Sequence, residues 1–177
     1  MQSFTNELID LNELPKYEEI ILENPHPNYW KVIVINISIF FLIVAIALTL
    51  FILFNKDFKA YSLAIGIGYL LLVIGTFLLY SASFKKRGYA LREKDVVYKS
   101  GIIAETTTII PLNRIQHVAL DEGLFARFYS LATLEVQTAG GSAGNMRIAG
   151  IPIEKAKIIK EALVKRLDLL ENATPSQ

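Results

Sequence analysis

Residues Val32–Phe54, VIVINISIFFLIVAIALTLFILF, form the first of two long apolar runs in this protein. The run holds no Asp, Glu, Lys, Arg or His over its 23 residues. As an α-helix rising ~1.5 Å per residue it would extend about 34 Å, slightly more than the roughly 30 Å hydrocarbon core of a bilayer. The run therefore predicts a transmembrane helix.

A second charge-free run, Tyr61–Ser83, follows after the short connection Asn55–Ala60. So short a connection predicts that the second helix returns antiparallel to the first, as a transmembrane helical hairpin over residues 32–84. Both runs contain small or polar residues, which let helices approach closely or hydrogen-bond to each other; these are Asn36, Ser38, Thr49, Gly66, Gly68 and Gly75. We interpret them as packing within the hairpin. Neither run places an ionisable group at mid-membrane, which argues against a pump or channel made by this chain alone.

The length and composition limit the kind of domain that can follow the hairpin. The 177 residues have a mean hydropathy of +0.39 and a formal net charge of +1. About 90 residues follow the hairpin, enough for one compact domain with its own core. The chain has no cysteine, which excludes disulfides, thiolate metal sites and cysteine nucleophiles. We expect no metal, no cofactor and no nucleic-acid partner.

Residues 1–31 form an acidic arm, with six Asp and Glu side chains against Lys16 and Lys31. A short helix is expected before Pro15, and Glu18–Glu23 is expected to pair as a strand. Asn24–Asn28 contains two prolines and is expected to stay non-helical. The acidic start and the late, long apolar run are unlike a cleaved signal peptide.

The bases around the hairpin predict its orientation. Lys85, Lys86 and Arg87 follow the second run directly, whereas the connection holds Lys56 and Lys59. The excess of positive charge favours the side of Lys85 as cytoplasmic. We therefore expect a multi-pass protein of the inner (cytoplasmic) membrane with both termini in the cytoplasm. The opposite orientation stays open, because Lys31 is the only base close to the start of the first run.

From Gly88 onwards the pattern changes to short β-type segments separated by turns. The expected strands are Tyr89–Arg92, Val96–Gly101, Ile103–Ile110, Ile115–Leu120, Leu131–Thr138 and Arg147–Ile151. In the fourth strand, simple alternation places Ile115 and His117 on one face and Val118 on the other. The glycine-rich segment 140–145 is expected to be a hairpin tip, with a phosphate cradle as the weaker alternative.

An amphipathic helix is expected after Pro152 and up to about Leu170, with Ala156, Ile159 and Leu163 on its apolar stripe. Residues 171–177 are expected to be a disordered tail. The fold class predicted for residues 85–170 is a small β-barrel or sandwich of antiparallel strands closed by the C-terminal α-helix.

The segment 87–141 resembles the bacterial pleckstrin-homology-like domain of the YdbS-like membrane proteins. The resemblance rests on Tyr89, Gly101, Pro111, Arg114–Val118, Leu124–Leu131, Leu134–Val136 and Thr138–Gly141, with Glu23–Pro27 ahead of two membrane helices. It implies two antiparallel sheets of about seven strands with a closing helix. It implies no enzymatic activity, and it implies a larger membrane protein with repeated domains of the same type as a partner.

Two sets of residues are candidates for binding. Lys85, Lys86, Arg87, Arg92 and Lys94 are candidates for contact with lipid headgroups. However, the first hairpin loop, Arg92–Asp95, balances its charges, so specific inositol-phosphate binding is not expected. Phe125, Arg127, Phe128 and Tyr129 are candidates for docking a partner or lipid headgroups, with packing beneath the barrel as an equal alternative.

Arg114, Gln116 and His117 form the most polar cluster, in which His117 would act as a general base or Arg114 as an anion clamp. Cross-strand packing is the favoured interpretation, because no carboxylate or nucleophile pattern accompanies them. We therefore expect a non-enzymatic, membrane-anchored interaction or scaffold module that assembles with other membrane proteins or with itself. Peripheral recognition of anionic lipid is the alternative, and a membrane enzyme is third.

Overall fold

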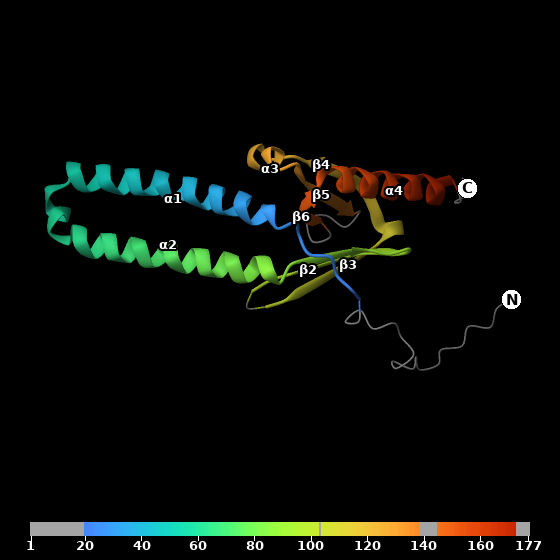
Figure 1. Ribbon diagram of the computed structural model, residues 1–177, viewed down its shortest axis with the longest axis horizontal. Coiled ribbons are helices and arrows are strands. Elements are labelled where there is room, and N and C mark those ends of the chain that lie inside the picture. The colour runs from blue at the N-terminus through green and yellow to red at the C-terminus, as the bar shows by residue number, and fades with distance from the viewer. Residues whose placement is uncertain (1–19, 103, 139–144, 173–177) are drawn as a thin grey trace.

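The computed structural model describes residues 20–102, 104–138 and 145–172, and it divides into a helical hairpin and a β-rich domain (Figure 1). The expected helix before Pro15, residues 140–144 of the glycine-rich tip expected at 140–145 and residues 173–177 of the tail expected at 171–177 lie outside the described residues. Residues 171–172 were expected to be part of the disordered tail, but they are helical. Both apolar runs are helical, and both helices are long and apolar enough to cross a membrane.

The hairpin consists of α1 (Asn28–Phe54), the 3-10 helix η2 (Lys56–Tyr61) and α2 (Ser62–Lys85). α1 begins four residues earlier than the apolar run, although Asn28 was expected to be non-helical. The φ of Pro27 is −54°, which suits the position before a helix, and His26 Nδ1 accepts a hydrogen bond from the Asn28 amide at 3.2 Å. The second proline therefore initiates the helix.

Large side chains, rather than small ones, pack α1 against α2. Ile33, Ile37 and Phe41 of α1 are buried against an aliphatic and aromatic row on α2, comprising Tyr69, Val73, Phe77 and Phe84. The Tyr69 hydroxyl donates to the Phe41 carbonyl at 2.6 Å. A Cβ added at Gly66, Gly68 or Gly75 would have no atom within 4 Å. Our interpretation that these glycines pack the hairpin is therefore wrong.

The domain contains two antiparallel sheets of three strands. One is β1 (Gly88–Leu91), β2 (Asp95–Ser100) and β3 (Thr106–Pro111); the other is β4 (Ile115–Asp121), β5 (Leu131–Thr138) and β6 (Met146–Pro152). The 3-10 helix η3 (Leu112–Arg114) joins the sheets, α3 (Leu124–Phe128) joins β4 to β5, and α4 (Ile153–Asn172) follows β6. This is the expected sandwich, without closure into a barrel, and the described residues contain six strands instead of about seven.

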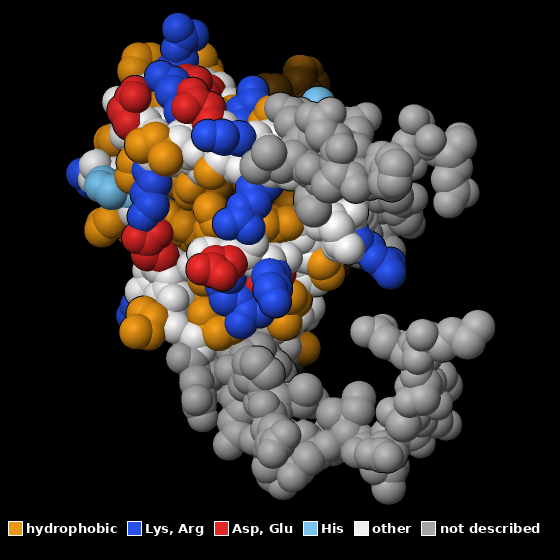
Figure 2. Space-filling view, turned by 90° about the vertical axis from the view of Figure 1, so that its right-hand side faces the viewer, with side chains coloured by type: hydrophobic (Ala, Val, Ile, Leu, Met, Phe, Trp, Pro, Cys, Tyr) orange, Lys and Arg blue, Asp and Glu red, His pale blue; other side chains and the backbone are white. Residues whose placement is uncertain are grey.

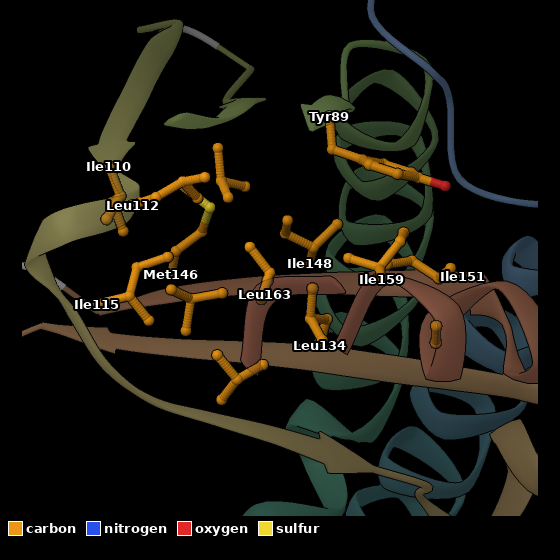
Figure 3. Close-up of a cluster of buried hydrophobic side chains, with 14 of the residues drawn as sticks. Tyr89, Ile110, Leu112, Ile115, Leu134, Met146, Ile148, Ile151, Ile159 and Leu163 are labelled. Carbon is orange, nitrogen blue, oxygen red and sulfur yellow. The ribbon is translucent and has the colours of Figure 1, made fainter. Parts of the chain in front are cut away.

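The core lies between the two sheets and α4 (Figure 3). Leu134, Ile148 and Ile151 of the second sheet are fully buried, and Val96 and Ile110 face them from the first. α4 contributes the predicted stripe, of which Ala156, Ile159 and Leu163 are all buried. The helix thus completes the core of an open sandwich, as its periodicity predicts.

Two strands depart from simple alternation because of β-bulges. In β4 the register shifts between Ile115 and His117, so Ile115 and Val118 are both buried while Gln116 and His117 are both exposed. The expected assignment of faces in this strand was wrong for that reason. β3 begins at Thr106, later than expected, and it includes Pro111, which stands at the strand end where its missing N–H does no harm.

A second bulge joins the hairpin to the domain. In β6 the register passes from Ala149 to Ile151, which leaves Gly150 as the extra residue with a φ of +83°. Its carbonyl accepts a hydrogen bond from the His26 amide at 2.8 Å. A Cβ on Gly150 would lie 2.6 Å from Cγ of Tyr29, so the Tyr29 ring sits directly on the backbone of β6.

The arm adds a further contact beside this junction. Glu23 forms an isolated antiparallel bridge with Tyr89, and its carboxylate pairs with Lys155 of α4. The Lys155 ammonium holds the pKa of Glu23 below its ordinary value, while burial, followed by the Glu23 hydrogen bond, raises the pKa of Tyr89. Of the expected strand Glu18–Glu23, the structure shows only this bridge, and residues 18–19 lie outside the described part.

We predict that Gly150→Ala loosens the junction of hairpin and domain. The new methyl group meets the Tyr29 ring, and alanine disfavours a positive φ, which together cost about 1–3 kcal/mol of stability. Thermal unfolding of the full chain in detergent measures the loss. Gly123→Ala is the matched control, because Gly123 has a φ of −59° and no atom within 4 Å of an added Cβ.

The cost of Gly150→Ala should shrink in a Tyr29→Ala background, where part of the clash is removed. If Gly150→Ala lowers the stability equally in the wild-type and Tyr29→Ala backgrounds, the Tyr29 ring does not contact Gly150.

Candidate functional site

The polar cluster Arg114, Gln116 and His117 lies on the exposed surface of η3 and β4. Within the described residues none of the three makes a side-chain hydrogen bond or an ion pair, and no group of three or more His, Cys, Asp or Glu is placed to hold a metal ion. The β4 bulge turns Gln116 and His117 outward together. The arrangement offers these side chains to solvent or to a partner surface.

The structure separates the five candidate lipid-binding bases into two groups. Lys85 ends α2, and Lys86 and Arg87 lie between α2 and β1, where the hairpin enters the domain. Arg92 and Lys94 lie in the turn between β1 and β2, at the other end of β1. Four strand residues span about 13 Å. The turn therefore lies away from the hairpin (Figure 1).

The Lys86 ammonium forms an ion pair with a carboxylate. Glu105, in the loop before β3, pairs with Lys86 at 2.9 Å and with Lys99 of β2 at 2.7 Å. These two ammonium groups, Lys99 first, lower the pKa of Glu105 from 4.5 to about 2. These ion pairs link the end of α2 to the first sheet, and Lys85 and Arg87 take no part in them.

Arg87 has spare hydrogen-bonding capacity. One guanidinium nitrogen donates to the Ser83 hydroxyl at a long 3.4 Å, and the buried Nε has no hydrogen-bond partner among the described residues. Burial raises the pKa of the neighbouring Tyr98 phenol, and the positive charge of Arg87 opposes that shift. Arg87 is therefore the base at this end of the domain with the most unused donors.

The remote turn is balanced in charge. Arg92 pairs with Asp95 through two hydrogen bonds, and the Glu93 carbonyl accepts from Arg166 of α4. Figure 2 views the molecule from the end opposite the hairpin, and Lys and Arg side chains alternate there with Asp and Glu. Such a face lacks the single sign of charge that attracts an anionic surface.

The structure divides the aromatic candidates between two sides of α3. Phe125 and Tyr129 pack around Ala126 against Val32 of α1 and Leu131 of β5. The Lys31 ammonium lies 5.8 Å from the centre of the Tyr129 ring. Phe128 instead faces solvent, 79% exposed, and Arg127 is also exposed. Phe125 and Tyr129 thus follow the packing alternative, while Phe128 and Arg127 are exposed and remain candidates for docking a partner or lipid headgroups.

A cleft of about 570 Å³ lies along the hairpin, between α1 and α2. It is lined by Tyr29, Ile33, Asn36, Ile37, Phe40, Phe41, Leu72, Thr76 and Tyr80. The Thr76 hydroxyl donates to the Leu72 carbonyl at 2.8 Å, but the Asn36 amide makes no hydrogen bond within the described residues. The cleft is thus apolar with one unpaired amide on its wall.

Sequence reasoning missed this cleft and the exposed Leu124 beside Phe128. Asn36 was noted as a polar residue in an apolar run, but which way it faces depends on the rotation of α1 against α2. Leu124 and Phe128 are four residues apart, which is one helical turn, and that spacing was the available signal for α3.

Comparison with known proteins gives a consistent result. A model of the family described as "Bacterial PH domain" matches residues 31–167. The UPF0699 transmembrane protein YdbS of Bacillus subtilis (strain 168) is 28% identical over 91 residues, which cover 51% of this chain and 55% of that protein. The UPF0699 transmembrane protein YdbT of the same organism is 24% identical over 106 residues, 59% of this chain and 21% of that protein.

The match thus spans about half the length of one relative and about a fifth of the other. No solved structure matches the chain.

We predict that Glu105→Gln removes a pH-dependent part of the stability. Because the folded pKa lies below the ordinary 4.5, the ion pairs stabilise the fold above about pH 4.5, and this contribution is lost as the pH falls toward 2. The difference in melting temperature between wild type and Glu105→Gln should be largest near neutral pH. It should become smaller as the pH falls from about 4.5 toward 2. Thermal unfolding of the full chain in a nonionic detergent measures it.

Glu122→Gln is the control for this experiment, because Glu122 is exposed and makes no ion pair within the described residues. A difference for Glu105→Gln that stays constant from neutral pH to pH 3 would contradict the assignment.

Proposed function

The chain belongs to the bacterial PH domain family, and from that premise we propose that it is a non-enzymatic assembly module of the cytoplasmic membrane. The hairpin spans the bilayer, both termini lie in the cytoplasm, and the PH domain stands at the membrane surface. The module assembles with other membrane proteins, including a larger protein with domains of the same family. A second copy of the chain is a further partner.

The way the hairpin joins the domain supports a scaffold. Tyr29 is seated on Gly150, Val32 is buried between Ala126 and Leu131, and Lys86 pairs with Glu105. Both helices therefore enter the domain through packed contacts instead of flexible linkers. A domain held in this way presents the same surfaces to its neighbours at a constant height above the bilayer.

The unpaired amide of Asn36 is the observation that carries the proposed assembly. Asn36 is exposed on the surface of α1, acyl chains offer it no hydrogen bond, and an unpaired polar group is costly in hydrocarbon. A transmembrane helix with a polar side chain would satisfy the amide. Gly68 extends the row of Leu72, Thr76 and Tyr80 along the same side of α2, and nothing contacts its Cα from outside, so another helix can approach closely there.

The relatives support a partner of the same family. YdbS and YdbT carry the name transmembrane protein, and the match covers only 21% of YdbT. A unit of this kind therefore also occurs within a larger chain. We propose that the cleft receives a transmembrane helix of such a protein.

Asn36→Leu should weaken this association, because interhelical hydrogen bonds in membranes contribute about 0.6 kcal/mol on average and up to about 1.7, or roughly threefold to twentyfold in affinity. Thr49→Val is the matched control on the same helix, since the Thr49 hydroxyl already donates to the Ala45 carbonyl. Affinity purification in mild detergent, with mass spectrometry and a second, differently tagged copy, measures the recovery of partners.

Recovery of the same membrane protein, or of the second copy, should persist in Thr49→Val and fall in Asn36→Leu. Equal recovery in both variants, or a lone monomer in the wild type, would contradict the proposal.

Recognition of anionic lipid is the second candidate, favoured by Arg87 at the membrane end of the domain, whose guanidinium makes only one long hydrogen bond within the described residues. Lys85 and Lys86 flank it, and each base near a charged surface contributes about 1 kcal/mol. Arg92 and Lys94 are not part of this proposed lipid-binding site, because they lie at the far end of β1.

Replacing Lys85, Lys86 and Arg87 together by Gln should lower the ratio of phosphatidylglycerol to phosphatidylcholine retained after extraction from mixed vesicles. Lys94→Gln, the control, should leave that ratio unchanged. An unchanged ratio in the triple variant would remove this candidate.

A further inference from the structure

Helix α3 displays two large apolar side chains that no described residue covers. Leu124 is 72% exposed and Phe128 is 79% exposed. They are four residues apart and so lie on one face of the helix. The opposite face is held in place, because Phe125, Ala126 and Tyr129 pack against Val32 and Leu131. The exposed pair therefore cannot turn inward without breaking that cluster.

The position of α3 relative to α1 identifies what lies opposite this face. Val32, against which Ala126 packs, is the first residue of the charge-free run that forms α1. Figure 1 shows α3 beside the beginning of α1, on the side of the domain that faces along the hairpin. Leu124 and Phe128 thus stand near the level at which the apolar part of α1 begins.

The length of α1 also supports a position of Leu124 and Phe128 near the surface of the hydrocarbon core. Its 27 residues extend about 40 Å, while the hydrocarbon core is roughly 30 Å thick. About two turns are left for the interfacial layer, and the residues at the start of α1 suit it: Tyr29, Trp30 and Lys31. α3 packs against these same turns.

We propose that α3 inserts Leu124 and Phe128 into the interfacial layer of the bilayer as a second membrane contact of the PH domain. Burial of two large apolar side chains is favourable there. Arg127 is exposed on the same short helix, and the Lys31 ammonium lies over the Tyr129 ring; both supply positive charge at the depth of the lipid phosphates. The nearby Asp121 is paired with Arg147 at 3.2 Å, which reduces its repulsion from the headgroups.

Such a contact would fix the tilt of the domain. A hairpin alone allows the whole protein to tilt in the bilayer, and a second contact to one side of it opposes that motion. This inference needs only that α1 spans a membrane, so it does not depend on the partner proposed for the cleft.

The single tryptophan of the chain makes the test direct. In a Trp30→Phe background, Phe128→Trp places the only indole on the exposed face of α3. Ile158→Trp in the same background is the matched control, since Ile158 is 66% exposed on α4. The full chain is reconstituted in phosphatidylcholine vesicles, with and without brominated acyl chains, and tryptophan emission is recorded.

We expect the emission of Phe128→Trp to be shifted to the blue of the control and to lose intensity with brominated lipid, while Ile158→Trp changes little. Leu124→Trp, as a second variant, should behave like Phe128→Trp. Emission like that of the control, without quenching in either α3 variant, would overturn the proposal. So would a blue shift that appears only when other membrane proteins are present, because α3 would then dock a protein.

Discussion

The contact between Tyr29 and Gly150 is the constraint on which the arrangement of the two parts depends. A bulge in β6 leaves Gly150 at a φ of +83°, and the absence of a Cβ lets the Tyr29 ring reach the backbone. Because Tyr29 lies in the first turn of α1, a local feature of a strand sets the direction in which the membrane helix leaves the domain. The packing of Val32 on Ala126 and Leu131 then follows.

This direction decides which surfaces of the domain lie beside the hairpin. Lys85, Lys86 and Arg87 are placed at the hairpin end, where Lys86 pairs with Glu105, whereas the turn of Arg92 and Asp95 points away. The same five bases would form one cluster if they were judged by spacing along the chain alone. A strand of four residues is enough to divide them, because each residue adds about 3.3 Å.

Two apolar surfaces remain uncovered, and they differ in depth. The cleft at Asn36 lies along the hairpin and offers a hydrogen-bonding group to another helix. The face of Leu124 and Phe128 lies where α1 begins and offers only apolar atoms. In the two proposals above, the first would receive a helix of a membrane protein and the second would insert into lipid, so that one chain would be held by the bilayer and still bind a neighbour.

The hairpin, a barrel or sandwich of antiparallel strands with its closing helix, and the family could be predicted from the amino-acid sequence, because charge-free runs, strand alternation and the stripe Ala156–Ile159–Leu163 are local patterns that solvent enforces. That the sandwich stays open follows from the pairing of its strands in two separate sheets. The outward faces of Gln116 and His117, the position of the α2 glycines away from the hairpin contact and the division of Phe125 from Phe128 could be seen only in the folded chain. A bulge, a helix rotation and a packing partner distant in sequence set these features, and none leaves a periodic signal in the chain.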